Sequence, residues 1–273
     1  MARQRLGQHF LVDAGWRDRI AGAIGISPRA IGGAQEQRAD TCWIEIGAGH
    51  GEMTGHLAAT GAAVYAIELD PKFTERLERL RERFPKLTVV PGDALQVDLL
   101  KIAAGRRMRI YGNLPYYITS PILHRMFEFA AEIDEIHFVA QLEVARRLTA
   151  SPGSRLYGYL SVAVQFYTRP EFVLRLPRGA FRPPPEVASA LVTLRLPGER
   201  TRLQLADEGR FLDFVKLCFA QKRKTLVNNL RTLAVPELVR EALAALKVRS
   251  DTRAEQLAVA QFAALFRRLI PEG

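Results

Sequence analysis

The chain has 273 residues, of which 48% are hydrophobic and 25% are charged, enough to bury one large core and a smaller second one. It holds no uncharged run of the ~18 residues that a membrane-spanning helix needs, no apolar N-terminal stretch typical of a secretory signal and only two cysteines, so we expect a cytoplasmic protein with no membrane partner and no disulfide framework. The formal net charge of +10 predicts a polyanionic partner.

Helical and strand patterns alternate through most of the chain, which predicts an α/β fold with a mostly parallel sheet. Strand patterns occur at 42–46, 63–67, 87–91, 108–112, 135–141, 171–176 and 188–196. Helical patterns occur at about 13–25, 52–60, 71–84, from the N-cap Ser120 onward, and at 143–150, 211–219, 235–246 and 252–269. Because only helices follow Pro197 and Gly198, we expect one domain over 1–197 and a helical one over 198–273.

A glycine-rich turn, Glu45-Ile-Gly47-Ala-Gly49-His-Gly51, follows the first strand pattern and precedes a helix. Gly47 and Gly49 would let the backbone approach a nucleoside-bearing ligand where a Cβ would clash. A dinucleotide site would need a third glycine at position 52, where this chain has Glu52, which would repel a pyrophosphate. The turn therefore favours a phosphate-free cofactor such as S-adenosylmethionine, with an ordinary strand–helix turn as the alternative.

Two acidic residues follow the next strand patterns. Glu68 comes 21 residues after Gly47, a distance at which an acidic residue accepts hydrogen bonds from ribose hydroxyls. Asp93 follows the third strand pattern, and a carboxylate there would accept from an adenine amine. Since the ends of parallel strands meet at one edge of the sheet, we expect both beside Gly47. For Asp93 alone, Gly-Asp is also a common turn.

The fourth strand pattern is followed at once by Asn113-Leu-Pro-Tyr116. An exocyclic base amine is a poor nucleophile, because its lone pair is delocalised into the ring. Acceptors such as the Asn113 side-chain oxygen and the Leu114 carbonyl would favour the pyramidal amine, while Pro115 restricts the backbone and Tyr116 offers a face for stacking. The segment predicts methyl transfer to a base nitrogen, the alternative being a proline turn with a buried tyrosine.

Further residues are candidates for contact with a nucleic acid. Phe181 precedes three prolines, and an exposed ring there would stack on the base opposite Tyr116; it could equally be a plug in the core. Basic residues cluster in three places, and each cluster is either an RNA contact or a solvated face. These clusters are Arg3 and Arg5; Arg146, Arg147 and, in a loop expected to be mobile, Arg155; and Lys222, Arg223 and Lys224.

Five stretches occur in a fixed order along the chain: Arg5–Leu11 (RLGQHFL), Glu45–Gly49 (EIGAG), Gly112–Ile118 (GNLPYYI), Phe181–Val187 (FRPPPEV) and Gln221–Thr225 (QKRKT). In this order they resemble the KsgA-type small-subunit ribosomal RNA adenine dimethyltransferases. Taken singly, the first, fourth and fifth stretches are weak signals, but the five together are highly specific. The chain departs from that family's common pattern at His9, where many members have Asn, and at Ala188, where many have Asp.

The resemblance implies a Rossmann-like class I methyltransferase with a mostly parallel seven-stranded sheet and a small all-helical C-terminal domain. It implies that S-adenosylmethionine donates two methyl groups to N6 of each of two adjacent adenosines near the 3′ end of small-subunit ribosomal RNA, and that a monomer acts on a pre-30S particle. It also implies that the cofactor pocket is lined by His9, Leu11, Gly47, Glu68, Asp93 and Asn113.

Two other functions remain open at this point. A methyltransferase that confers antibiotic resistance on the large subunit would share the fold and the chemistry, although that pattern more often has Ile where this chain has Leu114. A ribosome-assembly factor would keep the fold without depending on catalysis, although an intact Asn113–Tyr116 segment argues against a purely degenerate enzyme. No Cys/His cluster has metal-ligand spacing, so we expect no metal.

Overall fold

The computed structural model describes residues 9–26, 40–114 and 118–270, and the chain divides into two compact units. The first comprises residues 1–145 and 171–196, and the second comprises 146–170 and 197–273. The sequence-based boundary is therefore wrong for 146–170, which was expected in the first domain. This segment carries helix α7 (Tyr159–Tyr167), which packs against α9 (Glu208–Cys218) and α12 (Val259–Leu269) of the second unit.

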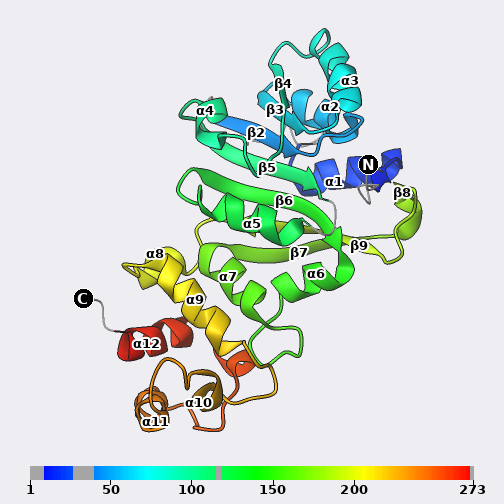
Figure 1. The fold of residues 1–273 in the computed structure, drawn as a ribbon. Helices are drawn as coiled ribbons and strands as arrows, with labels where there is room; N and C mark the ends of the chain where they lie inside the picture. Colours follow the sequence, from blue (N-terminus) through cyan, green and yellow to red (C-terminus); the bar gives the residue numbers. More distant parts are fainter. Residues whose placement is uncertain (1–8, 27–39, 115–117, 271–273) are drawn as a thin grey trace, which may run out of the picture. The chain divides into compact units, whose positions relative to one another are not determined.

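A seven-stranded sheet forms the centre of the first unit. Its strands are β2 (Thr41–Ile46), β3 (Ala63–Glu68), β4 (Leu87–Pro91), β5 (Arg107–Asn113), β6 (Ile133–Gln141), β7 (Arg169–Leu176) and β9 (Ser189–Arg195). Their order is β4-β3-β2-β5-β6-β9-β7 (Figure 1). Strands β2 to β6 run parallel to one another, whereas β9 runs antiparallel to β6. The α/β class and the mostly parallel sheet are confirmed.

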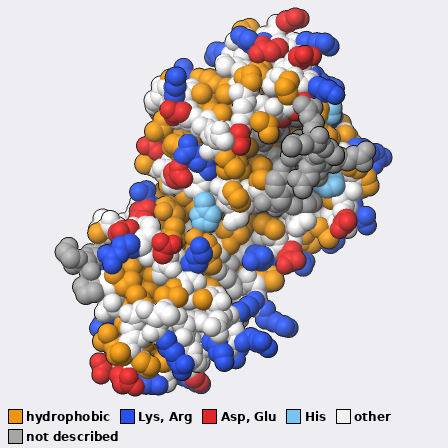
Figure 2. Space-filling model, in the orientation of Figure 1, with side chains coloured by type: hydrophobic (Ala, Val, Ile, Leu, Met, Phe, Trp, Pro, Cys, Tyr) orange, Lys and Arg blue, Asp and Glu red, His pale blue; other side chains and the backbone are white. Residues whose placement is uncertain are grey.

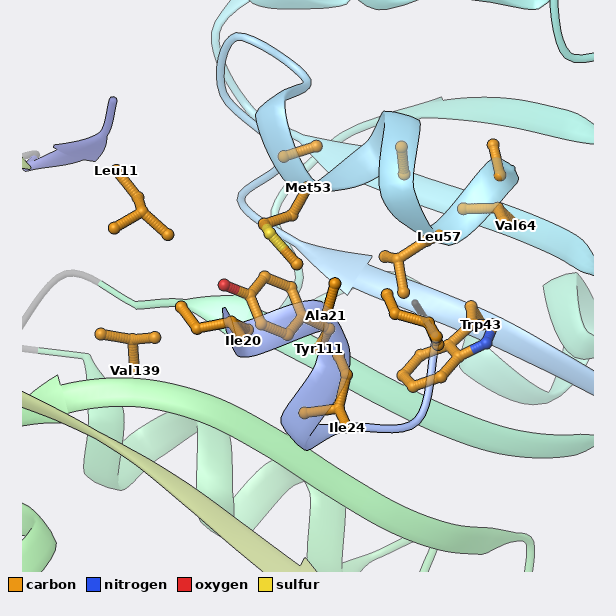
Figure 3. Close-up of a cluster of buried hydrophobic side chains, with 14 of the residues drawn as sticks. Leu11, Ile20, Ala21, Ile24, Trp43, Met53, Leu57, Val64, Tyr111 and Val139 are labelled. Carbon is orange, nitrogen blue, oxygen red and sulfur yellow. The ribbon is translucent and has the colours of Figure 1, made fainter. Parts of the chain in front are cut away.

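Successive parallel strands are joined by α2 (Glu52–Ala58), α3 (Pro71–Arg81), α4 (Leu99–Ala103) and α5 (Thr119–Phe127). Helix α1 (Ala14–Ala23) precedes β2, and α6 (Leu142–Leu148) follows β6. Figure 3 shows the core on the α1 side, where Ile20 and Ile24 lie against Trp43 of β2 and Tyr111 of β5. Each fully buried side chain of this size contributes about 1.5–3 kcal/mol, so this core anchors α1 on the sheet.

A second, two-stranded sheet pairs the N-terminal strand β1 (Phe10–Leu11) with β8 (Phe181–Arg182). The strands are antiparallel, with Leu11 opposite Phe181, and the backbone N–H of Val12 donates to Ala180 O at 3.0 Å. Strands of two residues are too short to show any hydrophobic period, which is why the sequence did not predict this pair.

The second unit is helical and has its own aromatic core. Besides α7, α9 and α12 it contains α8 (Arg200–Leu203), α10 (Leu226–Asn229) and α11 (Pro236–Ala245). The Phe211 ring lies 5.0 Å from Phe166 and 5.7 Å from Phe266, centroid to centroid. In the same core Phe219 lies 5.7 Å from Phe262. Ring pairs at these separations stabilise the packing of α7, α9 and α12 beyond the area they bury.

Several helices differ from the prediction. Helix α5 begins at Thr119 after the N-cap Ile118, so Ser120 lies inside the helix and is not its cap. The last helix begins at Val259 and not at 252, because a 3-10 turn over Ala254–Gln256 precedes it. Helix α7 was not predicted, since most of its side chains are buried and it shows no polar stripe. Within the described ranges, no helix is long and apolar enough to cross a membrane.

Candidate functional site

The carboxyl ends of four neighbouring parallel strands bring the predicted cofactor residues together. The N–H of Gly47, after β2, donates to Ile67 O of β3 at 2.9 Å. The N–H of Gly92, beside Asp93, donates to Glu68 O at 2.9 Å. On the other side of β2, Ile46 pairs with Gly112 of β5, which places Asn113 next to the glycine turn. The strand-end argument therefore located these residues at one edge of the sheet.

The glycine turn has the backbone that only glycine adopts readily. Gly47 and Gly49 have φ angles of 68° and 55°, in the left-handed region. A Cβ built on Gly47 would meet no atom of the described residues within 4 Å, so these residues leave open space beside the backbone at this point. A Cβ on Gly49 would lie 3.1 Å from the Phe10 ring, which packs directly over the turn. The turn is thus open at Gly47 and covered at Gly49.

Glu68 is buried, and backbone N–H groups hold its carboxylate. Oε2 accepts from Gly49 N at 2.8 Å, and Oε1 accepts from Leu69 N and Asp70 N, both at 2.9 Å. A carboxylate offers about four lone-pair sites, so three N–H donors leave room for a hydroxyl of a ligand. The half-buried Asp93 is held in the same way, since its Oδ1 accepts from Leu95 N at 2.9 Å.

Two buried polar groups beside the turn were not singled out from the sequence. Glu45 is 3% exposed, and Thr54 of α2 donates its hydroxyl to Glu45 Oε2 at 2.5 Å. Burial, reinforced by the charges of Glu52 and Glu68, raises the pKa of Glu45 to about 8. Tyr111 pairs with Glu45 across β5 and β2, and its buried hydroxyl has no hydrogen-bond partner among the described residues. Only the burial, which the sequence does not reveal, distinguishes these groups from ordinary strand residues.

The Asn113 side chain has a defined orientation. Its Nδ2 donates to the backbone carbonyl of His9 at 2.8 Å. Because a carbonyl oxygen only accepts, this bond fixes which end of the amide is the nitrogen, and Oδ1 is left as an acceptor. Leu114 is buried, and its side chain folds back so closely that a Cβ on Gly112 would lie 2.9 Å from it. Pro115 and Tyr116, the rest of the predicted segment, lie outside the described residues.

Phe181 is not the exposed ring that the sequence suggested. Only 1% of its surface is exposed, and it belongs to the core cluster that contains Leu11 and Leu176. The pairing of β8 with β1 turns this side chain inward, so the prediction of a solvent-exposed stacking face is wrong for this structure. Nearby, Nδ1 of His9 lies 2.8 Å from the carbonyl oxygen of Pro183. The Phe181–Val187 segment therefore meets the site through backbone contacts with β1.

The predicted basic residues of the second unit fall on its surface. Lys222, Arg223, Lys224 and Arg155 are exposed, and Lys222 Nζ donates to Arg155 O at 2.8 Å. The loop around Arg155, expected to be mobile, is held there and by Gly153 N, which donates to Glu255 O at 2.7 Å. Arg146 and Arg147 are exposed as well, and Figure 2 shows blue side chains crowded on one side of this unit. Arg3 and Arg5 lie outside the described residues.

A buried amide holds the turn that carries Lys222 to Lys224, called the basic turn below. Nδ2 of Asn229 donates to Cys218 O at 2.6 Å and to Gln221 O at 3.2 Å, while Oδ1 accepts from Gln221 N at 3.2 Å. In the part of the chain that the structure describes, neither Arg223 nor Lys224 forms an ion pair. Both cations are therefore presented to solvent from a fixed backbone.

The hydrogen-bond acceptors at the strand ends fit S-adenosylmethionine and not a phosphate. Glu68 and Asp93 carry carboxylate acceptors suited to a ribose diol, an amine or a cation, and neither has an ion-pair partner within the described residues. The open space beside Gly47 leaves room for a ligand against the backbone. Across those same residues, no group of three or more His, Cys, Asp or Glu side chains is arranged to hold a metal ion.

Comparison with known proteins agrees with this geometry. The family model described as ribosomal RNA adenine dimethylase matches residues 1–270. Ribosomal RNA small subunit methyltransferase A of Xanthomonas euvesicatoria is 40% identical over 261 residues, covering 96% of this chain and 94% of that protein. The protein of the same name from Koribacter versatilis is 38% identical over 280 residues, covering 98% and 94%.

Two solved structures share the fold over nearly the whole chain. A dimethyladenosine transferase from Plasmodium falciparum superposes with a TM-score of 0.79 at 23% identity, covering 96% of this chain and 98% of the other. The 23S rRNA methyltransferase ErmE superposes with a TM-score of 0.71 at 28% identity, covering 95% and 99%. The Rossmann-like class I methyltransferase fold is thereby confirmed.

Proposed function

Because this chain belongs to the ribosomal RNA adenine dimethylase family, we propose that it transfers methyl groups from S-adenosylmethionine to N6 of two adjacent adenosines near the 3′ end of small-subunit ribosomal RNA. It is an S-adenosylmethionine-dependent ribosomal RNA methyltransferase. The relatives named for the small subunit are aligned with it over 94% of their own length, which supports the same substrate.

In this proposal the strand ends hold the cofactor. Glu68 accepts hydrogen bonds from the ribose hydroxyls, Asp93 accepts from the adenine amine, and the open backbone at Gly47 lies against the ligand. The bound cofactor supplies a methyl group already activated on a sulfonium. Carboxylates without an arginine or lysine partner favour this cation electrostatically, while the backbone bonds to Glu68 keep its acceptors in place before the cofactor arrives.

The observation that carries the chemical part of the proposal is the orientation of Asn113. Its Oδ1 is left as an acceptor because Nδ2 is bound to His9 O. Together with the carbonyl of Leu114, this oxygen would bind both protons of the target amine and stabilise the pyramidal form that carries a localised lone pair. No strong base is needed, since the proton can leave to solvent after the methyl group has been transferred.

The second unit is proposed to dock the enzyme on its particle. The exposed Arg223 and Lys224 on the basic turn, with Arg146, Arg147 and Arg155, present cations to RNA phosphates. A docking surface of this kind suits a folded particle better than a free strand, so we take a pre-30S particle in the cytoplasm as the substrate and a monomer as the active form.

A second candidate, methylation of the large subunit, is favoured by the fold shared with ErmE at 28% identity. One assay separates the two. Purified protein is offered tritiated S-adenosylmethionine with small subunits that lack the methyl groups, with large subunits, and with small subunits already methylated. We expect label only in the unmethylated small subunit, on two adjacent adenines after digestion and mapping. Label in the large subunit alone would reject the proposal.

A further inference from the structure

The two-residue strand β1 contacts both halves of the proposed site. Phe10 is the contact on the cofactor side. Its ring lies 4.5 Å from that of His50 on the glycine turn and 5.4 Å from that of Phe73 on α3, centroid to centroid. It also covers Gly49, the residue whose N–H holds Glu68. The position of β1 therefore affects the geometry of Glu68, which accepts hydrogen bonds from the cofactor in the proposed site.

The second contact is made by the backbone of His9, the residue just before β1, on the side of the site that is proposed to bind the target base. Its carbonyl oxygen accepts from Asn113 Nδ2 at 2.8 Å, the bond that orients the amide. This oxygen is part of the main chain, so its place depends on what holds residue 9. A displacement of about 1 Å of a positioned group can lower a rate by about 100-fold, so small movements of β1 would matter.

The imidazole of His9 forms a hydrogen bond that fixes residue 9. Nδ1 lies 2.8 Å from Pro183 O, and because a carbonyl oxygen cannot donate, Nδ1 must carry the proton. The bond joins β1 to the segment just after β8 and adds to the ladder in which Phe10 faces Arg182 and Leu11 faces Phe181. A half-buried side chain thus fixes a strand of only two residues.

We propose that His9 is a positioning residue: its imidazole fixes β1 against Pro183, and β1 then holds the Asn113 amide through the His9 carbonyl while Phe10 covers the glycine turn. One short strand thus fixes the glycine turn of the cofactor site and the Asn113 amide relative to each other. The inference rests on the proposed role of Asn113 and assigns the side chain of His9 to positioning, not to contact with the cofactor.

The test uses two substitutions and a matched control. His9→Ala removes the donor to Pro183, whereas His9→Asn replaces it with an amide N–H. His56→Ala changes a histidine of α2 in the same unit, one that lies 3.9 Å from Asp18 and outside the site. With cofactor and RNA both saturating, we expect His9→Ala to lower the single-turnover rate by about tenfold, with His9→Asn and His56→Ala within about twofold of the wild type. Cofactor affinity should stay within about threefold in all of them, because the contacts of the Phe10 ring with His50 and Phe73 remain when the His9 side chain is removed.

A second readout does not depend on methylation. The side-chain amide signal of Asn113, identified in a ¹⁵N-correlated NMR spectrum by its loss in Asn113→Ala, should move in His9→Ala and keep its position in His9→Asn. An unmoved signal in His9→Ala, equal damage in both His9 variants, or a loss confined to cofactor affinity would overturn the inference. If the wild type methylates no ribosomal particle, the proposed function fails, while the NMR comparison still decides whether His9 positions Asn113.

Discussion

The acidic side chains at the two edges of the central sheet have different kinds of partner. At the amino-terminal edge of the parallel strands, Arg107 binds Asp134 at 2.6 Å, and Glu135 is bound by Arg109 at 3.2 Å and by Arg195 at 3.4 Å. At the carboxyl edge, backbone N–H groups and a threonine hydroxyl bind Glu45, Glu68 and Asp93. Carboxylates paired with arginine have little left to offer a ligand, whereas acidic groups held by neutral donors keep part of their acceptor capacity.

The pKa values of two glutamates express the same contrast. The largest influence on Glu135 is His137, whose Nε2 lies 2.9 Å from the Glu135 carboxylate. Together with the charge of Arg109, His137 lowers the pKa of Glu135 to about 2, despite partial burial. Burial with Glu52 and Glu68 nearby raises the pKa of Glu45 to about 8. At the amino-terminal edge arginines neutralise the carboxylates, which supports the fold. At the carboxyl edge Glu68 and Asp93 have no arginine or lysine partner among the described residues, and a cationic cofactor would complement them.

The largest expected effect of a substitution at the carboxyl edge of the sheet is at Asn113. We expect Asn113→Ala to lower single-turnover methylation by roughly 100-fold or more, by analogy with the loss of one preorganised polar contact. RNA affinity and melting temperature should change little, since the side chain is only half-buried and a neutral hydrogen bond such as that to His9 O contributes about 0.5–1.5 kcal/mol. Asn228→Ala in the second unit serves as the control. Rates within a few-fold of the wild type would make Asn113 structural.

Glu68 tests the acceptor capacity of the carboxyl edge. Glu68→Ala should weaken S-adenosylmethionine binding by about 1.5–3 kcal/mol, the range for a lost charge-assisted hydrogen bond. The affinity of Glu68→Gln, which keeps an oxygen but loses the charge, should lie between those of the wild type and Glu68→Ala. Isothermal titration calorimetry measures the change, with folding checked by circular dichroism. Wild-type affinity in a folded Glu68→Ala protein would remove this residue from the cofactor site.

The raised pKa of Glu45 predicts a stability that falls with rising pH. Glu45 stays protonated in the folded protein while the unfolded chain ionises above about pH 4.5, so its contribution is present below that pH and lost as pH rises toward 8. The side chain of Glu45→Gln cannot titrate. Between pH 5 and pH 8 the wild type should therefore lose about 1–3 kcal/mol more of its free energy of unfolding than the variant does. Urea unfolding at the two pH values measures the difference, and parallel pH profiles would contradict it.

Glu135 should show the opposite sign. Its lowered pKa means that its contribution is present above about pH 4.5 and lost as pH falls toward 2. Glu135→Gln should lower the free energy of unfolding at pH 7 by about 1–2 kcal/mol, a modest figure because the pair is partly exposed. Methylation by the folded variant should be unchanged. A larger effect on turnover than on unfolding would place this edge in the functional machinery.

The smallest expected effect concerns charge away from both edges. Replacing Lys222, Arg223 and Lys224 with Ala should weaken RNA binding and lower the slope of log affinity against log salt, by about 0.7–0.9 for each phosphate that is no longer neutralised. Arg223→Ala with Lys224→Ala should account for most of the change, since Lys222 also bonds to Arg155 O. Cofactor affinity should be unaffected, and methylation should recover at saturating RNA. An unchanged slope would shift attention to Arg146, Arg147 and Arg155.

Much of the site could be located from the sequence because its residues follow strand ends. Gly47, Glu68, Asp93 and Asn113 each lie at or just after the end of an apolar run, and parallel strands bring such positions to one edge whatever the details of packing. Left-handed glycines and the residues flanking a proline are likewise local properties of the chain. The basic turn was visible as three adjacent cations, although the amide of Asn229 that holds it was not.

Only the tertiary structure decided which side chains turn inward and which segments meet. Phe181 reads as exposed beside three prolines, yet the pairing of β8 with β1 buries it. Glu45 has the same local setting as any strand residue, and its raised pKa arises from its burial and from the charges of Glu52 and Glu68. The segment 146–170 joins the second unit although it is continuous in sequence with the first. Each of these outcomes depends on contacts between residues far apart in the chain, and a local pattern carries no information about such contacts.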